Sequence, residues 1–107
     1  MQRIIGLDDI KNIDFRTTRL VDVRSQTVYS FGSIPGAINI PATEMQRLYE
    51  LPKDKKIYVF CQKGEISGDI TEILLDAGYD AYELKCGYLG YLKELLEEED
   101  NIKIEKR

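Results

Sequence analysis

Two cysteines, Cys61 and Cys86, hold most of the reactive chemistry that this chain of 107 residues offers. No histidine accompanies them, so a Cys–His catalytic pair within the chain is excluded. Two thiols without histidine are also too few for a typical zinc site. We therefore expect no metal and no cofactor. Each cysteine is then either a small buried apolar residue or a reactive thiol.

The residues after Cys61 are suited to hold an anion. Cys61 ends an apolar run, a short loop follows, and a helix is expected to begin near Ser67. Such a loop turns its backbone N–H groups inward, and the start of the helix adds partial positive charge. Gly64 provides the backbone freedom that a tight ring needs, and Lys63 adds a charge. A thiolate is therefore favoured here, although the residues alone also fit a Cys61 that is only the buried end of a strand.

The elements that must position these residues alternate between strands and helices. The sequence predicts strands over 19–23, 37–40, 56–60 and 81–84, and helices over 7–11, 27–31, from 43, over 67–77 and over 88–98. This alternation favours an α/β fold with a parallel sheet covered on both faces. Ligands of such folds bind at the carboxyl ends of the strands. The prediction therefore brings Asp22, Arg24, Cys61 and Cys86 to one edge of the sheet.

The last predicted helix carries the acidic excess of the chain. Fifteen Lys and Arg against nineteen Asp and Glu give a formal net charge of −4. The acids concentrate at Glu94 and over 97–100, as is typical of a solvated helix end. Leu92, Leu95 and Leu96 are expected to face inward, and the tail over 101–107 is expected to be a strand or frayed.

Composition excludes several classes of protein. Hydrophobic residues make up 43% of the chain, which is typical of a folded domain rather than a disordered one. No apolar run approaches the roughly 20 residues of a membrane helix, and residues 1–6 lack the apolar stretch of a signal peptide. No basic stripe suits nucleic acid. We therefore expect a cytoplasmic protein that binds neither membrane nor nucleic acid.

Three ordered segments resemble the signature motifs of rhodanese domains. The first precedes the Cys61 strand, the second contains it, and the third closes the sheet. They comprise Leu20–Arg24 with Tyr29 and Gly32–Pro41, then Tyr58–Ser67, then Ala77–Tyr79 with Leu84–Gly87. Together they cover almost the whole chain in the order and spacing of the family.

This resemblance implies one rhodanese-like domain over residues 1–107, a three-layer fold in which helices cover a mostly parallel five-stranded sheet. It implies a sulfurtransferase of sulfur metabolism whose Cys61 is the nucleophile and carries sulfane sulfur as a persulfide. The donor would be thiosulfate or a polysulfide, and the acceptor cyanide, a thiol or a protein. Asp22 and Arg24 would brace neighbouring loops as buried structural support. Backbone amides of the loop would hold the persulfide, from Gln62, Lys63, Gly64, Glu65, Ile66 and Ser67.

Three positions depart from the family pattern. Ile66 stands where the loop commonly has an arginine, which would bind an anionic donor. We therefore predict weak thiosulfate activity, and the missing cation also disfavours phosphoryl transfer. Val28 replaces a usual acid and removes an ion pair, and Ser33 replaces a usual histidine and alters local hydrogen bonding.

Two other hypotheses remain open from the sequence. One is a catalytically inactive rhodanese-like binding module. The other is a redox pair in which Cys86 resolves a persulfide or sulfenate on Cys61. Against the second, Cys86 also fits as a small residue tolerated in a turn, and a disulfide requires Cα atoms within roughly 7 Å.

Overall fold

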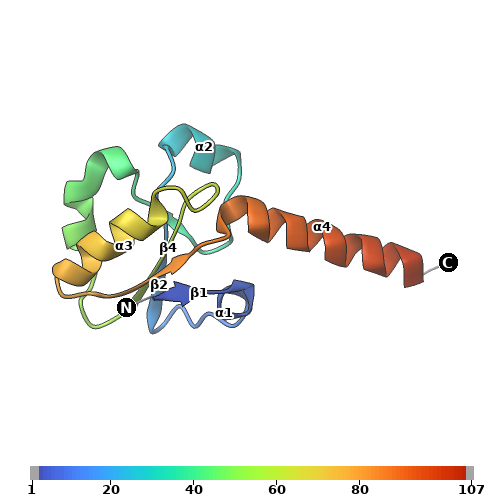
Figure 1. The fold of residues 1–107 in the computed structure, drawn as a ribbon, viewed down its shortest axis with the longest axis horizontal. Helices are drawn as coiled ribbons and strands as arrows, with labels where there is room; N and C mark the ends of the chain where they lie inside the picture. Colours follow the sequence, from blue (N-terminus) through green and yellow to red (C-terminus); the bar gives the residue numbers. More distant parts are fainter. Residues whose placement is uncertain (1–2, 106–107) are drawn as a thin grey trace.

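Five parallel strands form the sheet of the computed structural model, which describes residues 3–105 and the side chains of residues 3–99. The strands are β1 (Ile4–Ile5), β2 (Thr18–Asp22), β3 (Ile38–Asn39), β4 (Lys56–Phe60) and β5 (Asp80–Leu84). They lie in the order β1-β5-β4-β2-β3, and all four neighbouring pairs are parallel. β4, which leads to Cys61, therefore lies in the middle of the sheet (Figure 1).

Helices pack on both faces of this sheet (Figure 1). They are α1 (Leu7–Lys11), α2 (Gln26–Phe31), the 3₁₀ segment η1 (Ala42–Glu50), α3 (Ser67–Asp76) and α4 (Gly87–Glu105). On one face, Leu48 of η1 and Leu74 of α3 belong to a buried apolar cluster. On the other face, Ile10 of α1 belongs to a second cluster, against which Tyr88 of α4 packs. The predicted three-layer α/β fold is confirmed.

The alternation of side chains along β4 explains why both layers form. Ile57 and Val59 belong to the cluster beneath η1 and α3. Phe60 belongs to the cluster beneath α1 and α4, and Tyr58 packs against it. A strand that is buried on both faces is apolar at nearly every position, and the sequence of β4 has this pattern.

The sequence predicted four of the five strands, with β3 two residues shorter than expected. It missed β1, because two residues are too few to show a period. β1 depends on its partner instead: Ile4 and Ile5 pair with Glu83 and Leu84 of β5. The Arg3 side chain adds a bond from Nε to the Ala81 carbonyl oxygen, at 2.8 Å.

Local residues mark one end of each of two helices. Ser25 caps α2, because its Oγ accepts a hydrogen bond from the Val28 amide at 3.2 Å. Gly78 follows the end of α3 with a φ of +91°, a conformation that favours glycine. The helix expected from residue 43 is instead the 3₁₀ segment η1, which is broken at Glu44 (φ −121°, ψ 47°).

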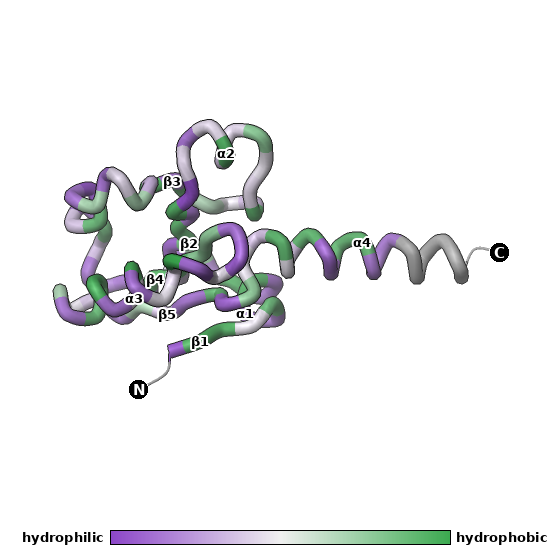
Figure 2. Tube along the Cα trace, turned by 45° about the horizontal axis from the view of Figure 1, so that its top comes forward, coloured by the Kyte–Doolittle hydropathy of each residue, from purple (hydrophilic) through white to green (hydrophobic). Residues whose placement is uncertain are grey.

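Two expectations for the last helix were wrong. The segment over 101–105, expected as a strand or frayed, continues α4 as helix, and residues 106–107 lie outside the described residues. Leu95 and Leu96 do not face inward, since they are 40% and 61% exposed. The reason is that α4 leaves the body of the domain after its first turns, with polar and apolar residues alternating along it (Figures 1 and 2). Among the described residues, no helix combines the length and apolar character needed to cross a membrane.

The difference between the core and the projecting helix gives a first prediction. Leu74→Ala removes a side chain that is 1% exposed, so it should lower the free energy of unfolding by about 2–5 kcal/mol through lost burial and a cavity. Leu96→Ala, the matched control, should change it by less than about 0.5 kcal/mol. Urea denaturation followed by circular dichroism measures both. Equal losses in the two variants would contradict the packing described for α4.

Candidate functional site

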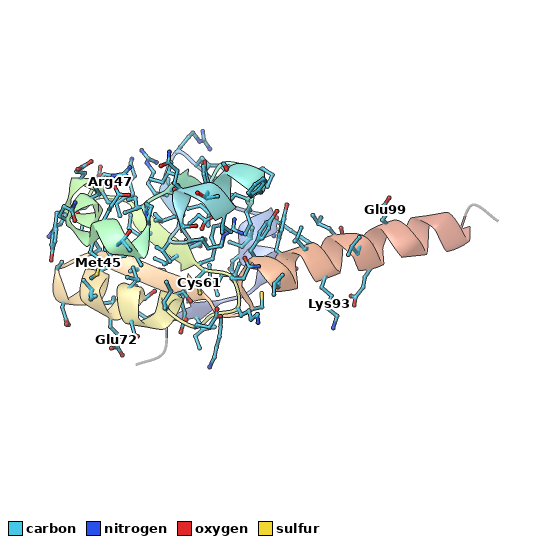
Figure 3. All side chains as sticks on the ribbon, turned by 90° about the horizontal axis from the view of Figure 1, so that it is seen from above. Met45, Arg47, Cys61, Glu72, Lys93 and Glu99 are labelled. Atoms are coloured by element: carbon cyan, nitrogen blue, oxygen red, sulfur yellow. The ribbon has the colours of Figure 1, made fainter. Side chains whose placement is uncertain are left out.

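Cys61 lies directly after β4 at the carboxyl edge of the sheet, and only 2% of its surface is exposed. Its backbone carbonyl accepts a hydrogen bond from the Tyr88 amide at 2.9 Å, and the next carbonyl, of Gln62, accepts one from Leu89 at 3.1 Å. The amides of the first turn of α4 are thereby held against the end of β4. Figure 3 shows Cys61 within the body of the domain, with Lys93 and Glu99 far out along α4.

The loop after Cys61 bends back toward the sulfur. The Gly64 amide donates a hydrogen bond to Cys61 Sγ, with an N–S distance of 3.2 Å. Gly64 has a φ of +86°, and a Cβ at this position would collide with the Lys85 carbonyl oxygen. Both the backbone angle and the close approach therefore require glycine. The result is a backbone donor aimed at the sulfur, as an anion site requires.

Glu65 places a carboxylate inside the same loop. Its Oε1 accepts hydrogen bonds from the Lys63 amide at 2.8 Å and from the Cys61 thiol, whose Sγ lies 3.9 Å away. Of the two neighbouring amides, that of Gly64 therefore contacts the sulfur, whereas that of Lys63 contacts a side chain. Sequence reasoning treated Glu65 only as a source of a backbone amide and missed this carboxylate.

The end of the loop is fixed to the sheet through Ser67. Ser67 has no exposed surface, and its Oγ donates a hydrogen bond to Glu83 Oε2 of β5 at 3.1 Å. Ile66, the residue before it, is 37% exposed and precedes the first turn of α3. The position at which the family commonly has arginine therefore faces solvent in part.

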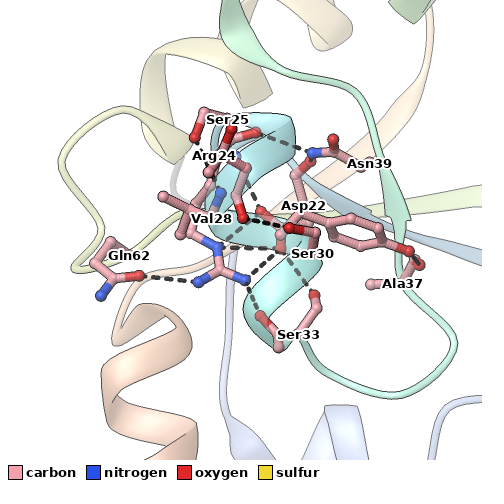
Figure 4. Close-up of polar contacts among 12 residues, drawn as sticks. Asp22, Arg24, Ser25, Val28, Ser30, Ser33, Ala37, Asn39 and Gln62 are labelled. Atoms are coloured by element: carbon pink, nitrogen blue, oxygen red, sulfur yellow. Dashed lines mark hydrogen bonds and ion pairs between the residues drawn. The ribbon is translucent and has the colours of Figure 1, made fainter.

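Asp22 and Arg24 form a buried ion pair at the end of β2 (Figure 4). Arg24 Nε and Nη2 donate to the Asp22 carboxylate at 2.7–3.1 Å, and the Arg24 amide donates to the same group at 2.9 Å. The guanidinium also donates to Gln62 Oε1 at 3.0 Å and to the Gly32 carbonyl oxygen at 2.7 Å. One buried charge pair thus connects β2, the segment after α2 and the Cys61 loop.

Comparison with known proteins decides the family of this chain. A family model for the rhodanese-like domain matches residues 7–94. The chain belongs to the rhodanese-like domain family.

Three relatives show how close this rhodanese-like domain is to known members. It is 37% identical over 76 residues to the uncharacterized protein YqhL of Bacillus subtilis, covering 69% of this chain and 60% of YqhL. It is 36% identical over 96 residues to a human thiosulfate:glutathione sulfurtransferase, covering 76% of this chain and 81% of the relative. A rhodanese-related protein of Thermoplasma volcanium has a similar structure, with a TM-score of 0.78, 30% identity and coverage of 86% and 92%.

The domain corresponds to only part of several longer curated relatives. It spans between 28% and 60% of the length of three of them. The shared part is the rhodanese-like fold, so the activities of those whole proteins do not transfer by similarity alone.

Cys86 lies in the turn between β5 and α4, and both cysteines are free thiols. Its Sγ lies against Gly90, where an added Cβ would come within 2.7 Å of it. Partial burial raises the pKa of the Cys86 thiol above its ordinary value, and the charge of Glu94 acts in the same direction. A thiol with a raised pKa is less often a thiolate at neutral pH, and this weakens the case for Cys86 as an attacking nucleophile.

Other residues contact the ion pair in ways that the sequence did not specify. The Tyr88 ring lies 4.2 Å from the Arg24 guanidinium carbon, a cation–π contact. The Asn39 amide donates to the carbonyl oxygens of Asp22 and Arg24, at 2.9 Å each. Ser33, which was expected only to alter local hydrogen bonding, donates from its Oγ to Asp22 Oδ2 at 2.8 Å.

The buried ion pair gives a second prediction. Asp22→Asn removes the charge that compensates Arg24, so it should lower the free energy of unfolding by about 3–5 kcal/mol. Asp54→Asn is the matched control, because Asp54 is largely exposed and 3.8 Å from Lys55, and exposed pairs contribute little. Guanidinium denaturation measures both. An Asp22→Asn domain as stable as the parent would show that Arg24 does not depend on this charge.

Proposed function

We propose that this rhodanese-like domain is a sulfurtransferase or sulfur-relay protein that carries sulfane sulfur as a persulfide on Cys61. The observation that carries the proposal is the hydrogen bond from the Gly64 amide to Cys61 Sγ. The positive φ of Gly64 lets the loop bend back toward the sulfur. A preorganised backbone donor stabilises negative charge on sulfur without having to reorganise during the reaction. The human relative named as a thiosulfate:glutathione sulfurtransferase supports the same assignment.

The proposed reaction has two displacement steps at sulfur. In the first, the Cys61 thiolate attacks the sulfane sulfur of the donor, a new S–S bond forms, and the donor's own S–S bond breaks. With thiosulfate, the electron pair of the broken bond leaves with sulfite. In the second, an acceptor thiolate, cyanide or a protein nucleophile attacks the outer sulfur, and Cys61 leaves as thiolate. Backbone amides of residues 62–67 would stabilise the outer sulfur, and Asp22 and Arg24 would hold the loop.

A second candidate is a binding module with the rhodanese fold and no sulfur transfer. The observation that favours it is that residues 62–67 of the loop include no arginine. Ile66 provides no guanidinium, and the Lys63 amide is already bonded to Glu65. The Arg24 guanidinium is close to the loop through Gln62 but is bonded to Asp22. The two candidates differ in one measurable property, which is the ability of Cys61 to accept sulfur.

Intact-protein mass spectrometry tests that property directly. After incubation with thiosulfate or with a polysulfide, the parent domain and its Cys86→Ser variant should gain the mass of one sulfur atom. The Cys61→Ser variant should gain none, because the proposed carrier is absent. If neither donor adds sulfur to the parent while iodoacetamide still alkylates Cys61, the binding-module candidate is the correct one.

Restoring a cation to the loop should raise activity with thiosulfate. In Ile66→Arg the guanidinium can pair with the donor anion, so kcat/KM in the thiosulfate:cyanide reaction should rise by about tenfold. Leu96→Arg is the matched control, because it adds the same charge at an exposed position on the projecting part of α4. An unchanged rate in Ile66→Arg, or an equal rise in both variants, would contradict the importance assigned to residue 66.

A further inference from the structure

We propose that the Glu65 carboxylate makes the Cys61 loop select organic persulfides, which are donors of low charge, over the dianion thiosulfate. This inference rests on the proposed function and adds the class of donor to it. It depends on a side chain whose position within the loop the structure defines, and it is separate from the effect of Ile66.

The first step concerns the amide that Glu65 occupies. Its Oε1 accepts the Lys63 N–H at 2.8 Å, two residues after the cysteine. An incoming anion would use such inward-turned amides as donors. The Glu65 carboxylate already accepts the hydrogen bond of the Lys63 amide. A donor anion must therefore displace Glu65 or bind without a hydrogen bond from this amide.

The second step concerns charge. The same Oε1 lies 3.9 Å from Cys61 Sγ, so any sulfur attached to Cys61 is transferred next to a carboxylate. Two like charges about 4 Å apart near a protein surface repel strongly enough to change a rate by tenfold or more. Thiosulfate carries two negative charges into this position and leaves sulfite, which also carries two. Since Glu65 is exposed, solvent and salt reduce the repulsion, and we expect an effect of about tenfold.

An organic persulfide avoids most of this repulsion. The Cys61 thiolate attacks the terminal sulfur of the persulfide in its protonated form, R–S–SH, the new S–S bond forms, and the donor S–S bond breaks with its electron pair on R–S⁻. The proton stays on the transferred sulfur, so the loop receives Cys61–S–SH and no second charge at the attacked atom. The leaving thiolate carries one charge and departs on the organic side, away from the amides of the loop. The same geometry therefore penalises thiosulfate more than a persulfide.

The test compares the two donors in matched variants. Glu65→Gln keeps an oxygen that can accept the Lys63 amide and removes only the charge. Asp69→Asn, the control, removes an exposed carboxylate from the first turn of α3, four residues further along the chain. For each protein, kcat/KM for sulfur transfer to a fixed thiol acceptor is measured with thiosulfate and with glutathione persulfide, at low and at high ionic strength.

In Glu65→Gln, kcat/KM for thiosulfate should rise by about tenfold, while that for glutathione persulfide changes by less than about threefold. The acceleration of the thiosulfate reaction by salt should also be smaller than in the parent. If the ratio of kcat/KM for thiosulfate to kcat/KM for glutathione persulfide is unchanged in Glu65→Gln, or shifts equally in Asp69→Asn, the role of Glu65 is overturned. The sulfur-carrier function would still stand. If neither donor loads sulfur onto Cys61 in any variant, the proposed function and this inference both fail.

Discussion

The carboxylate of Asp22 has no exposed surface, and the carboxyl edge of the sheet is arranged to compensate its charge. An unpaired carboxylate at such a depth is unstable by several kcal/mol. The Arg24 guanidinium and the Ser33 hydroxyl donate to it, and Arg24 must itself be oriented by further contacts. Those contacts are the Gln62 amide oxygen, the Gly32 carbonyl and the Tyr88 ring. The ion pair thus determines how the segment after α2, the Cys61 loop and α4 lie relative to one another.

Two glycines then set how closely these segments approach. Gly64 lies against the Lys85 carbonyl, and a Cβ on Gly87 would come within 2.5 Å of the Gln62 carbonyl oxygen. Both residues have positive φ, of +86° and +69°. The Cys61 loop is therefore held between the end of β4 and the turn that leads from β5 into α4. A loop fixed in this way keeps the Gly64 amide directed at Cys61 Sγ, and a fixed donor of this kind stabilises charge on a sulfur at that point.

The sequence predicted the layers of this domain better than the contacts within its site. The apolar residues of β4 and α3 recur with periods that indicate which faces of these elements are buried. Ser25 and Gly78 mark helix ends by local signals that a short stretch of sequence shows. The contacts of Glu65, Tyr88 and Asn39 have no such period. Each depends on the distance between segments that are far apart in the chain or on the rotamer of one side chain. The outward course of α4 was missed for a related reason, since Leu95 and Leu96 have the spacing of a buried face but are 40% and 61% exposed.

The electrostatic character of the loop follows from which charges are already paired. The Arg24 guanidinium contacts the loop through Gln62, yet its nitrogens also bind Asp22 and Gly32. At residue 66 the chain has an apolar side chain, and at residue 65 an anion. Stabilisation of charge on Cys61 therefore falls mainly to backbone amides, whose dipoles are fixed by the fold and do not depend on a mobile cation. Such a site can stabilise the sulfur of the cysteine itself while giving little attraction to a free dianion. In the proposed function, the fold sets where sulfur is held, and residues 65 and 66 set which donors are able to deliver it.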